Sequence, residues 1–389
     1  MKVAIVAYGH SDNVICLAKH VSSLAEVKVI FITSGNRFTR SIFDWDLRQL
    51  PFGLTQDEEV VRQYIGASVD RYLNGSIGVL IARTPSRSIV KDWSRRNLTY
   101  VKEVAEFILD NSFDVVHFNG FSGFQLHFYR YLKALPKVYT VHDYVPHGGE
   151  WKITPVVLNR IYAKMNYQFI QHYRYLSKSF ARFYSVDPER VHTIYCGPLE
   201  VYRSFSIKSI SEEPKTILFF GRISPYKGIR YLIEAMPEIR RQLPGVKCVI
   251  AGKGNIGMAF ENNGEYEIYN YHIPNDKMVD LVRRAAVIVL PYTDATHSAV
   301  LMTSYAFNKP VVASRVGGIP EVVFDDITGL LVPPGNAHAI STAIISLLHD
   351  EKKRIDMKNS IARMCTTGFL SWDHIAKDTV MVYQEAIRS

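Results

Sequence analysis

Two basic residues, Arg222 and Lys227, lie five positions apart in a loop between a short apolar run and a helical pattern. The run, Thr216–Phe220, has the length and composition of a buried strand, and Gly221 ends it. A helix opening near Gly228 would add unpaired N–H groups and a partial positive charge. Arginine can grip phosphate oxygens in a bidentate manner, and lysine adds a point charge. The loop therefore predicts an anion site with a diphosphate as its ligand. From spacing alone, an ordinary turn with two solvated cations is the alternative.

The elements that must position this loop alternate between apolar runs and helical stretches along the chain. Continuous β-branched runs between helices predict parallel sheets buried on both faces, joined by helical crossovers. The expected strands are Val3–Ala7, Val27–Ile32, Val115–Phe118, Val138–Val141, Ile217–Phe220, Val246–Ala251, Val287–Leu290 and Val311–Ala313. The pattern occurs twice. We therefore predict an α/β protein with two doubly wound Rossmann-like domains facing a cleft, where ligands bind beyond the carboxyl ends of the strands.

A change in composition between the two halves marks the expected domain boundary. The pattern breaks at Cys196–Pro198, and the polar stretch Ser206–Lys215 follows. We predict an N-terminal domain over residues 1–198, a linker over 199–215 and a C-terminal domain over 216–370. A last helix at about 371–389 is expected to pack back on the N-terminal domain.

Composition excludes several classes of protein. A chain of 389 residues that is 47% hydrophobic and 21% charged is globular and not disordered. Its four scattered cysteines have no metal-type spacing, which is typical of reduced core residues in a cytosolic protein. The first residues run directly into a strand pattern without a signal peptide, and no apolar run is long enough to span a bilayer.

The formal charge of +9 has one conspicuous source, the segment Trp151–Val186, which contains no acidic residue. Its cations and aromatics interleave: Lys152, Arg160, Lys164, Arg174, Lys178 and Arg182, with Tyr162, Tyr167, Phe169, Tyr173, Tyr175 and Phe180. A basic aromatic helix can lie on an anionic membrane surface. A domain helix with a solvated cationic face is the alternative. Nucleic acid is a poorer candidate partner, because no recognition motif accompanies the charge.

Further motifs follow the Arg222/Lys227 loop in a fixed order. They are the strand and Gly-x-Gly turn Val249–Gly254, the loop Pro291–Ser298, the segment Lys309–Glu321 with Lys-Pro-Val-Val-Ala-Ser and Gly-Gly, and Thr328–Gly335. This order resembles the GT-B glycosyltransferases of the family-4 type (glycosyl transferases group 1). The N-terminal segments Asp114–Gly120 and Thr140–Glu150 look like a subgroup that builds bacterial surface polysaccharides.

The resemblance implies a retaining transferase of the hexosyltransferase type, which moves a sugar from a nucleotide-diphosphate donor onto a glycan or lipid-linked acceptor. Neither a metal nor another cofactor is expected. The implied place of work is the cytoplasm, with a peripheral position on the inner face of the plasma membrane. Arg222 and Lys227 would neutralise the diphosphate as negative charge builds on the leaving group. The other donor-binding residues implied are Gly221, Gly252, Gly254, His297, Ser298, Thr303 and Glu321.

One departure from the family pattern concerns two glutamates separated by seven residues, one near the donor sugar and one at the ribose. Alignment on Lys309 places these positions at Ala295 and Thr303. Asp294, one residue away, is the expected catalytic substitute, and Thr303 is expected to bond a ribose hydroxyl. Either the subgroup holds the sugar differently, or activity is lost.

Polar residues also end the predicted N-terminal strands. His142 is expected to contact the donor sugar, and the expected acceptor-side residues are Gly9, His10, Asn119, His147 and Glu150. A plain loop with Ser11 or Asp12 as helix cap is the alternative for the turn at Gly9. His117 lies within a strand pattern, which favours a buried, hydrogen-bonded histidine. No spacing typical of metal ligands occurs.

Two rival functions stay open at this point. A sugar-nucleotide epimerase would share the architecture but would be expected to place more carboxylates in the cleft. A non-catalytic subunit that binds nucleotide sugars would explain the missing glutamates.

Overall fold

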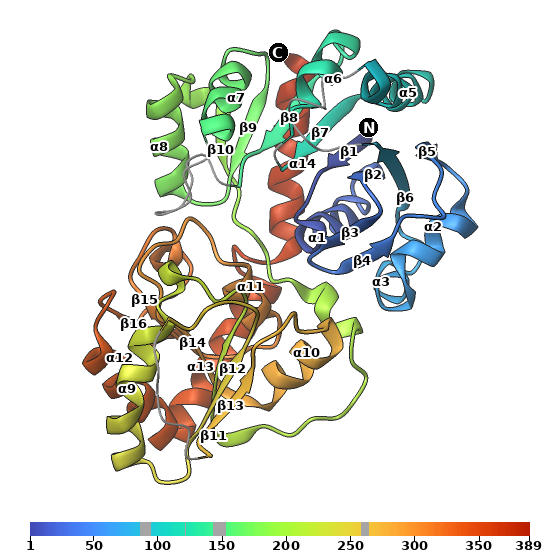
Figure 1. Cartoon of the computed structure of the whole chain (residues 1–389). Helices are drawn as coiled ribbons and strands as arrows, with labels where there is room; N and C mark the ends of the chain where they lie inside the picture. Colours follow the sequence, from blue (N-terminus) through green and yellow to red (C-terminus); the bar gives the residue numbers. More distant parts are fainter. Residues whose placement is uncertain (86–94, 121, 143–152, 258–263) are drawn as a thin grey trace. The chain divides into compact units, whose positions relative to one another are not determined.

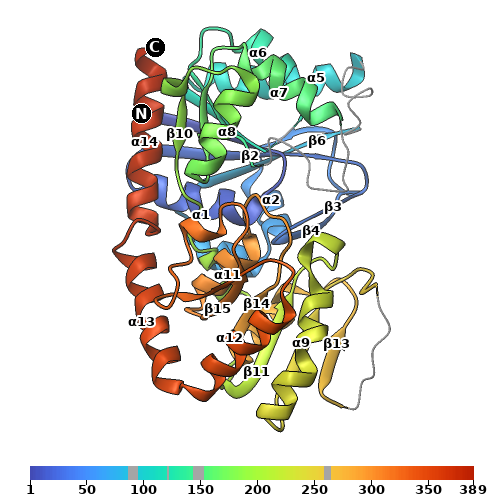
Figure 2. The ribbon, with the colours of Figure 1, turned by 90° about the vertical axis from the view of Figure 1, so that its left-hand side faces the viewer.

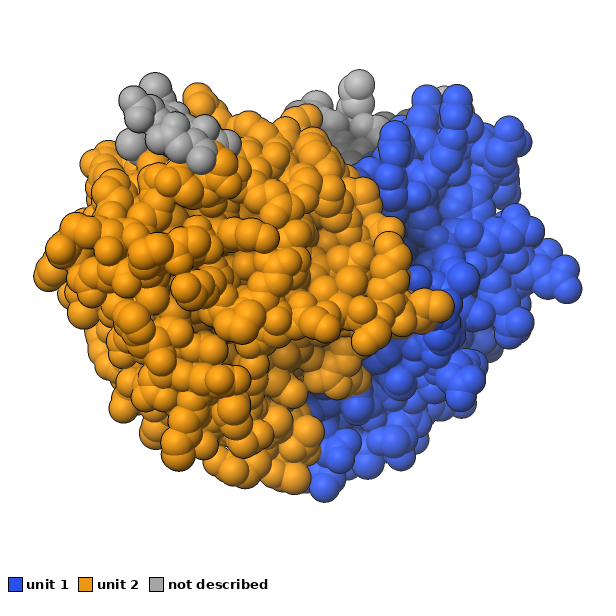
Figure 3. Space-filling model, turned by 90° about the horizontal axis from the view of Figure 1, so that it is seen from below, with its two compact units in different colours: residues 1–146, 152–196, 372–389 blue, residues 147–151, 197–371 orange. Residues whose placement is uncertain are grey.

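The computed structural model describes residues 1–389 except 86–94, 121, 143–152 and 258–263. The described residues form two compact units, coloured blue and orange in Figure 3. Unit 1 draws on Met1–Pro146, Lys152–Cys196 and Trp372–Ser389, and unit 2 on Gly197–Ser371. Each unit has a mainly parallel sheet with helices around it, which confirms the predicted α/β class with two parallel-sheet domains.

Unit 1 contains an eight-stranded sheet in the order β10-β9-β8-β7-β1-β2-β6-β5. All its pairs are parallel except that of β5 with β6. The strands are β1 (Lys2–Ala7), β2 (Glu26–Ser34), β5 (Gly53–Thr55), β6 (Gly78–Thr84), β7 (Val115–Asn119), β8 (Lys137–Thr140), β9 (Gln168–Gln171) and β10 (Val191–Thr193), beside a hairpin of β3 (Arg37–Arg40) and β4 (Phe43–Asp46). Strand order reverses between β1 and β7, so their carboxyl ends lie at a switch point where such sheets bind ligands.

Helices flank this sheet, and a large aromatic core lies between it and α5–α8. They are α1 (Ser11–Val21), α2 (Glu58–Ile65), α3 (Ala67–Leu73), α5 (Arg95–Asp110), α6 (Gln125–Tyr131), α7 (Ile153–Ala163), α8 (Arg174–Tyr184), the short 3₁₀ turn η1 (Pro188–Arg190) and α14 (Trp372–Arg388). The last helix, α14, packs on α1, β7 and β8 (Figure 1). His117 of β7 is fully buried and bonds Tyr383 of α14 at 2.8 Å and Thr140 at 2.7 Å. Burial lowers the pKa of His117 to about 3, so the residue is neutral and structural.

Unit 2 contains a six-stranded parallel sheet in the order β13-β12-β11-β14-β15-β16. Its strands are β11 (Glu213–Phe220), β12 (Lys247–Ala251), β13 (Tyr266–Tyr269), β14 (Ala285–Leu290), β15 (Val311–Ser314) and β16 (Gly329–Val332). Its helices are η2 (Glu200–Ser204), η3 (Pro225–Lys227), α9 (Ile229–Gln242), α10 (Asn275–Arg284), α11 (Ala299–Ala306), η4 (Ile319–Glu321), α12 (Ala337–His349) and α13 (Glu351–Thr366). Helices α9 and α12 lie side by side on one face (Figure 2). Because parallel crossovers are right-handed, α10 and α11 cover the other face.

All eight apolar runs expected as strands are strands, but the expected linker at 199–215 is not a free connection. The division between the units falls after Cys196, and the residues that follow pack on unit 2. Ser206 donates to Asp280, and the Glu212 carboxylate accepts from Lys309 and Lys358. Glu213 already begins β11. The stretch is polar because its side chains have polar partners in the domain.

The acid-free segment after Trp151 is also different from the single basic aromatic helix expected. It comprises α7, β9 and α8. Five of the six aromatics singled out in it are buried, and only Tyr175, at 52% exposed, faces solvent. The cations Arg160, Lys164, Arg174, Lys178 and Arg182 are all exposed. The aromatics therefore build the core of unit 1, and the charge forms its surface. Among the helices of the described residues, none is both long and apolar enough to cross a bilayer.

Candidate functional site

The loop between β11 and α9 places Arg222 and Lys227 together, as the sequence predicts. Gly221 follows β11, and η3 carries Lys227 to the start of α9. Arg222 donates from Nη2 to the hydroxyl of Tyr226 at 3.1 Å. The centre of the Tyr226 ring lies near both cations, 5.8 Å from the Arg222 guanidinium carbon and 5.3 Å from Lys227 Nζ. One aromatic ring thus holds both positive charges on the same short loop.

The loop between β14 and α11 supplies the second part of the site. Tyr292 is buried, and Lys227 Nζ lies 3.7 Å from the centre of its ring. Ser298 caps α11, because its side chain accepts a hydrogen bond from Leu301 N at 3.2 Å. His297 precedes that cap. A Cβ added at Gly221 would lie 3.0 Å from Val300, so the end of β11 lies against the first turn of α11. Two cations and a helix N-terminus therefore converge, which is the composition of an anion site.

Gly252 and Gly254 follow β12, and their first role is to let the chain approach itself. A Cβ at Gly252 would lie 1.8 Å from the carbonyl oxygen of Gly221, and one at Gly254 would lie 1.9 Å from that of Ile223. Hydrogen bonds from Ile223 N to Lys253 O at 3.0 Å and from Gly221 N to Ala251 O at 2.9 Å extend the β11–β12 pairing. Any side chain at these two positions would push the Arg222 loop out of place. The local fold therefore requires both glycines, independently of any ligand.

The two positions at which the family carries glutamates are both buried in this structure. Ala295 is buried, and its carbonyl oxygen would lie 1.6 Å from a Cβ at Gly317. Thr303 is buried within α11, where its hydroxyl donates to Ala299 O at 2.8 Å. Asp294 is half-buried between these loops, and Glu321 ends η4 after β15. The expected donor-binding residues thus all follow carboxyl ends of unit 2 strands, except Thr303, which lies one helical turn further on.

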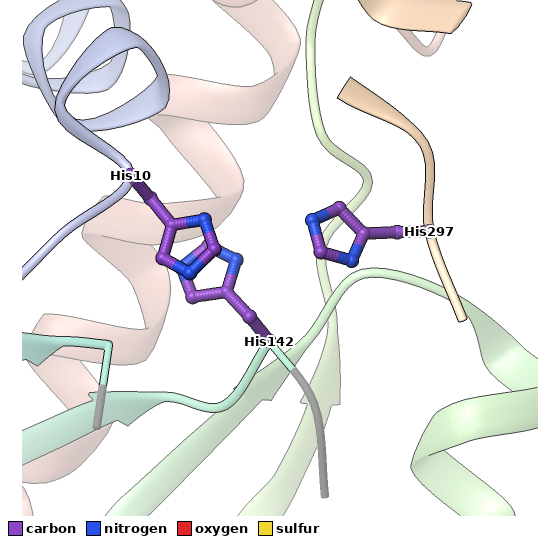
Figure 4. A group of neighbouring side chains, drawn as sticks. All are labelled: His10, His142 and His297. Carbon is purple, nitrogen blue, oxygen red and sulfur yellow. The ribbon is translucent and has the colours of Figure 1, made fainter. Parts of the chain in front are cut away.

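In unit 1, the carboxyl ends of β1, β7 and β8 bring three expected residues together. The rings of His10 and His142 stack with their centres 3.5 Å apart (Figure 4), and His142 Nε2 lies 2.8 Å from Asn119 Oδ1. Gly9 precedes His10, which itself occupies the N-cap position of α1 in a left-handed conformation. The alternative of Ser11 or Asp12 as the helix cap is wrong, because His10 holds the N-cap position and no side-chain hydrogen bond caps the helix. The remaining acceptor-side residues, His147 and Glu150, lie outside the described residues.

Sequence reasoning missed three residues of these two clusters. His172 follows β9, and its ring centre lies 4.9 Å from that of His142. The signal available was its position after an apolar run, the same position that His142 has. Tyr226 and Tyr292 were the other two, and both stand inside motifs that the sequence offers. The sequence does not predict a site role for either tyrosine, because a linear motif does not show which residue a tyrosine side chain contacts.

Two family models match this chain, one in unit 2 and the other mainly in unit 1. The family model of glycosyl transferases group 1 matches residues 203–364, and that of Glycosyltransferase Family 4 matches residues 60–197. The chain belongs to the GT-B glycosyltransferases of the family-4 type. The loop of Arg222 and Lys227 lies in the range matched by the first model, and Asn119 and His142 lie in the range matched by the second.

Similar glycosyltransferases and solved structures agree with this placement. An uncharacterized glycosyltransferase of Methanocaldococcus jannaschii is 32% identical over 184 residues, which are 46% of this chain and 47% of that protein. The D-inositol 3-phosphate glycosyltransferase of Corynebacterium glutamicum is 30% identical over 227 residues, 52% of this chain and 54% of that one. The chain thus spans about half the length of these curated relatives. The structure of Anabaena Alr3699/HepE in complex with UDP has a TM-score of 0.66 at 14% identity, covering 99% of this chain and 100% of that chain, which shows the GT-B fold.

Proposed function

We propose that this protein transfers a sugar, with retention, from a nucleotide-diphosphate donor onto a glycan or lipid-linked acceptor in the biosynthesis of a cell-surface polysaccharide. The observation that carries the proposal is the convergence of Arg222, Lys227 and the N-terminus of α11 at the carboxyl end of the unit 2 sheet. Such a site stabilises a leaving diphosphate without help from a metal. Retention is part of the proposal because the family-4 type is retaining.

A panel of nucleotide sugars tests the donor part of this proposal. A true donor at a hundred times its dissociation constant adds about 2.7 kcal/mol to the free energy of unfolding, which appears as a rise in Tm. Nucleotide sugars that pass this screen are then incubated with candidate glycan and lipid-linked acceptors. Transfer of the sugar separates a transferase from an epimerase, which would instead change the free nucleotide sugar. Absence of stabilisation across the whole panel would contradict the proposal.

A non-catalytic subunit that binds nucleotide sugars is the second candidate. The observation that favours it is the absence of both family glutamates, because Ala295 and the internally bonded Thr303 offer no carboxylate. This candidate predicts the same thermal stabilisation by the donor but no transfer and no epimerisation by the purified protein.

We infer that Asp294 supplies the carboxylate that contacts the donor sugar. Its neighbour Thr293 donates from its backbone N to Tyr226 O at 2.8 Å, so the residue is held next to the Arg222/Lys227 loop. Asp294→Asn removes the charge but keeps the size of the side chain. We expect a loss of turnover with nearly unchanged affinity for the free nucleoside diphosphate, measured by steady-state kinetics and calorimetry. An equal loss of both would place Asp294 at the nucleotide, and no loss of either would remove it from the site.

We also propose that the cationic surface of α7 and α8 docks unit 1 on an anionic membrane and so reaches a lipid-linked acceptor. Arg174, Lys178 and Arg182 recur every four residues along α8 and line a cavity of about 590 Å³ together with β10. Its lining also includes Ser177 and Thr193, whose hydroxyl oxygens are 2.7 Å apart. Next to these cations, Tyr175 and Phe183 are 52% and 47% exposed. Cations beside exposed aromatics are typical of surfaces that bind anionic headgroups.

Vesicle binding tests this surface. Changing Lys164, Arg174 and Lys178 together to glutamine should weaken co-sedimentation with anionic vesicles at low salt, because each cation near such a surface contributes about 1 kcal/mol. The wild-type protein should dissociate at high salt and ignore neutral vesicles. The matched control changes three exposed cations elsewhere in unit 1, Arg62, Lys377 and Arg388, to glutamine. Equal binding by both triple variants would mean that net charge, and not this surface, is responsible.

A further inference from the structure

Lys227 lies against a buried aromatic ring that belongs to another loop. Its ammonium nitrogen is 3.7 Å from the centre of the Tyr292 ring, and that ring is 1% exposed. The face of an aromatic ring carries partial negative charge and attracts a cation at this distance. The Tyr292 ring therefore attracts Lys227 without adding a full negative charge to the site. A carboxylate in its place would repel a diphosphate.

The ring is fixed to the start of α11. The Tyr292 hydroxyl lies 3.4 Å from Ser298 Oγ, and that oxygen accepts the capping hydrogen bond from Leu301 N. A lysine side chain is flexible and loses conformational freedom when it binds an anion. A ring that already holds the ammonium beside the helix N-terminus reduces this cost, because less freedom is left to lose.

The neighbouring loop holds Arg222 in a similar manner. The Tyr226 hydroxyl accepts from Arg222 at 3.1 Å, while the carbonyl oxygen of Tyr226 accepts from Thr293 N at 2.8 Å. Thr293 directly follows Tyr292, so both tyrosines and both cations are connected through the loop after β14.

We propose that Tyr292 is a positioning residue, whose ring holds the Lys227 ammonium at the N-terminus of α11 so that both meet the donor diphosphate in a fixed geometry. This inference rests on the proposed function. Tyr292 then affects the rate of sugar transfer only by its contact with Lys227.

A double-mutant cycle tests the assignment. Tyr292→Leu removes the ring and should lower kcat/KM about tenfold, the scale of a desolvated cation–π contact. Tyr292→Phe keeps the ring and should lose less than about threefold. In a Lys227→Met background, Tyr292→Leu should cost no further activity. A full additional loss in that background, or wild-type kinetics of Tyr292→Leu, would overturn the proposal.

A graded series keeps the test decisive if Tyr292→Leu does not fold. Phenylalanine at position 292 with one, two and three ring fluorines has nearly the same shape but progressively less negative charge on its face. The rate should fall stepwise along this series with at most a small fall in Tm, and a flat rate across the series would overturn the proposal. These outcomes are separate from failure of the proposed function, because that failure would already appear as no donor stabilisation and no transfer by the wild-type protein.

Discussion

Replacing Arg222 or Lys227 with alanine is expected to lower kcat by about a hundredfold or more, the scale seen when one electrostatic stabiliser of a transition state is lost. Both cations lie on one loop and share the ring of Tyr226. Negative charge grows on the diphosphate as the glycosidic bond breaks, so their attraction is larger in the transition state than in the ground state. The loss should therefore fall mainly on kcat, measured under saturating donor, with a smaller change in KM.

The control for this prediction is Arg230→Ala. Arg230 is exposed on α9, three residues beyond Lys227, and faces Glu234. The Arg230→Ala change removes one positive charge from the same region. Because Arg230 lies outside the proposed anion site, near-normal kinetics are expected. Wild-type turnover in both the Arg222 and the Lys227 variants would refute the assignment. A similar loss in Arg230→Ala would show that only the overall charge of the region matters.

Glu212→Gln is expected to lower the free energy of unfolding by about 2 kcal/mol, less than the loss of one partner of a fully buried ion pair, because the Glu212 side chain is 23% exposed. Lys309 is buried, and its ammonium donates to Glu212 and to Arg283 O at 2.7 Å, and to Ala285 O at 2.6 Å. Burial lowers the pKa of Lys309. Burial raises the pKa of Glu212, but hydrogen bonds from Lys309 and Lys358 more than offset this, so the net direction is down. Glutamine would leave the Lys309 charge without its counter-ion.

Urea denaturation of the wild-type protein and of Glu212→Gln at neutral pH measures the difference between their free energies of unfolding. Because the folded pKa of Glu212 lies below its unfolded value, its stabilising contribution is present above the unfolded pKa and is lost as the pH falls through the folded one. The gap between wild type and Glu212→Gln should therefore narrow in acid. The control is Glu238→Gln, which breaks an exposed pair with Arg241 and should change stability little. A Glu212 variant as stable as wild type would mean that the two carbonyl acceptors suffice for Lys309.

The residues that sequence reasoning placed well are those whose position depends on local pattern. Strand runs such as Val3–Ala7 and Ile217–Phe220 are apolar because both faces of a parallel sheet are buried, and that requirement is visible in a few consecutive residues. Gly221, Arg222 and Lys227 follow such a run directly, so their common loop could also be predicted. The same local reasoning misjudged the aromatics between Trp151 and Val186, because burial depends on which face of the sheet and helix they occupy.

The chain by itself therefore determined the two parallel α/β sheets and the polar residues at the carboxyl ends of their strands, because the periodicity and the loops are local properties. Only the tertiary structure decided what those residues contact. Lys227 contacts Tyr292, which is 65 positions away in the sequence, and Lys309 contacts Glu212, which is 97 positions away. Contacts at such separation form when crossover helices bring strand ends to one edge of a sheet, and no local pattern in the sequence records them.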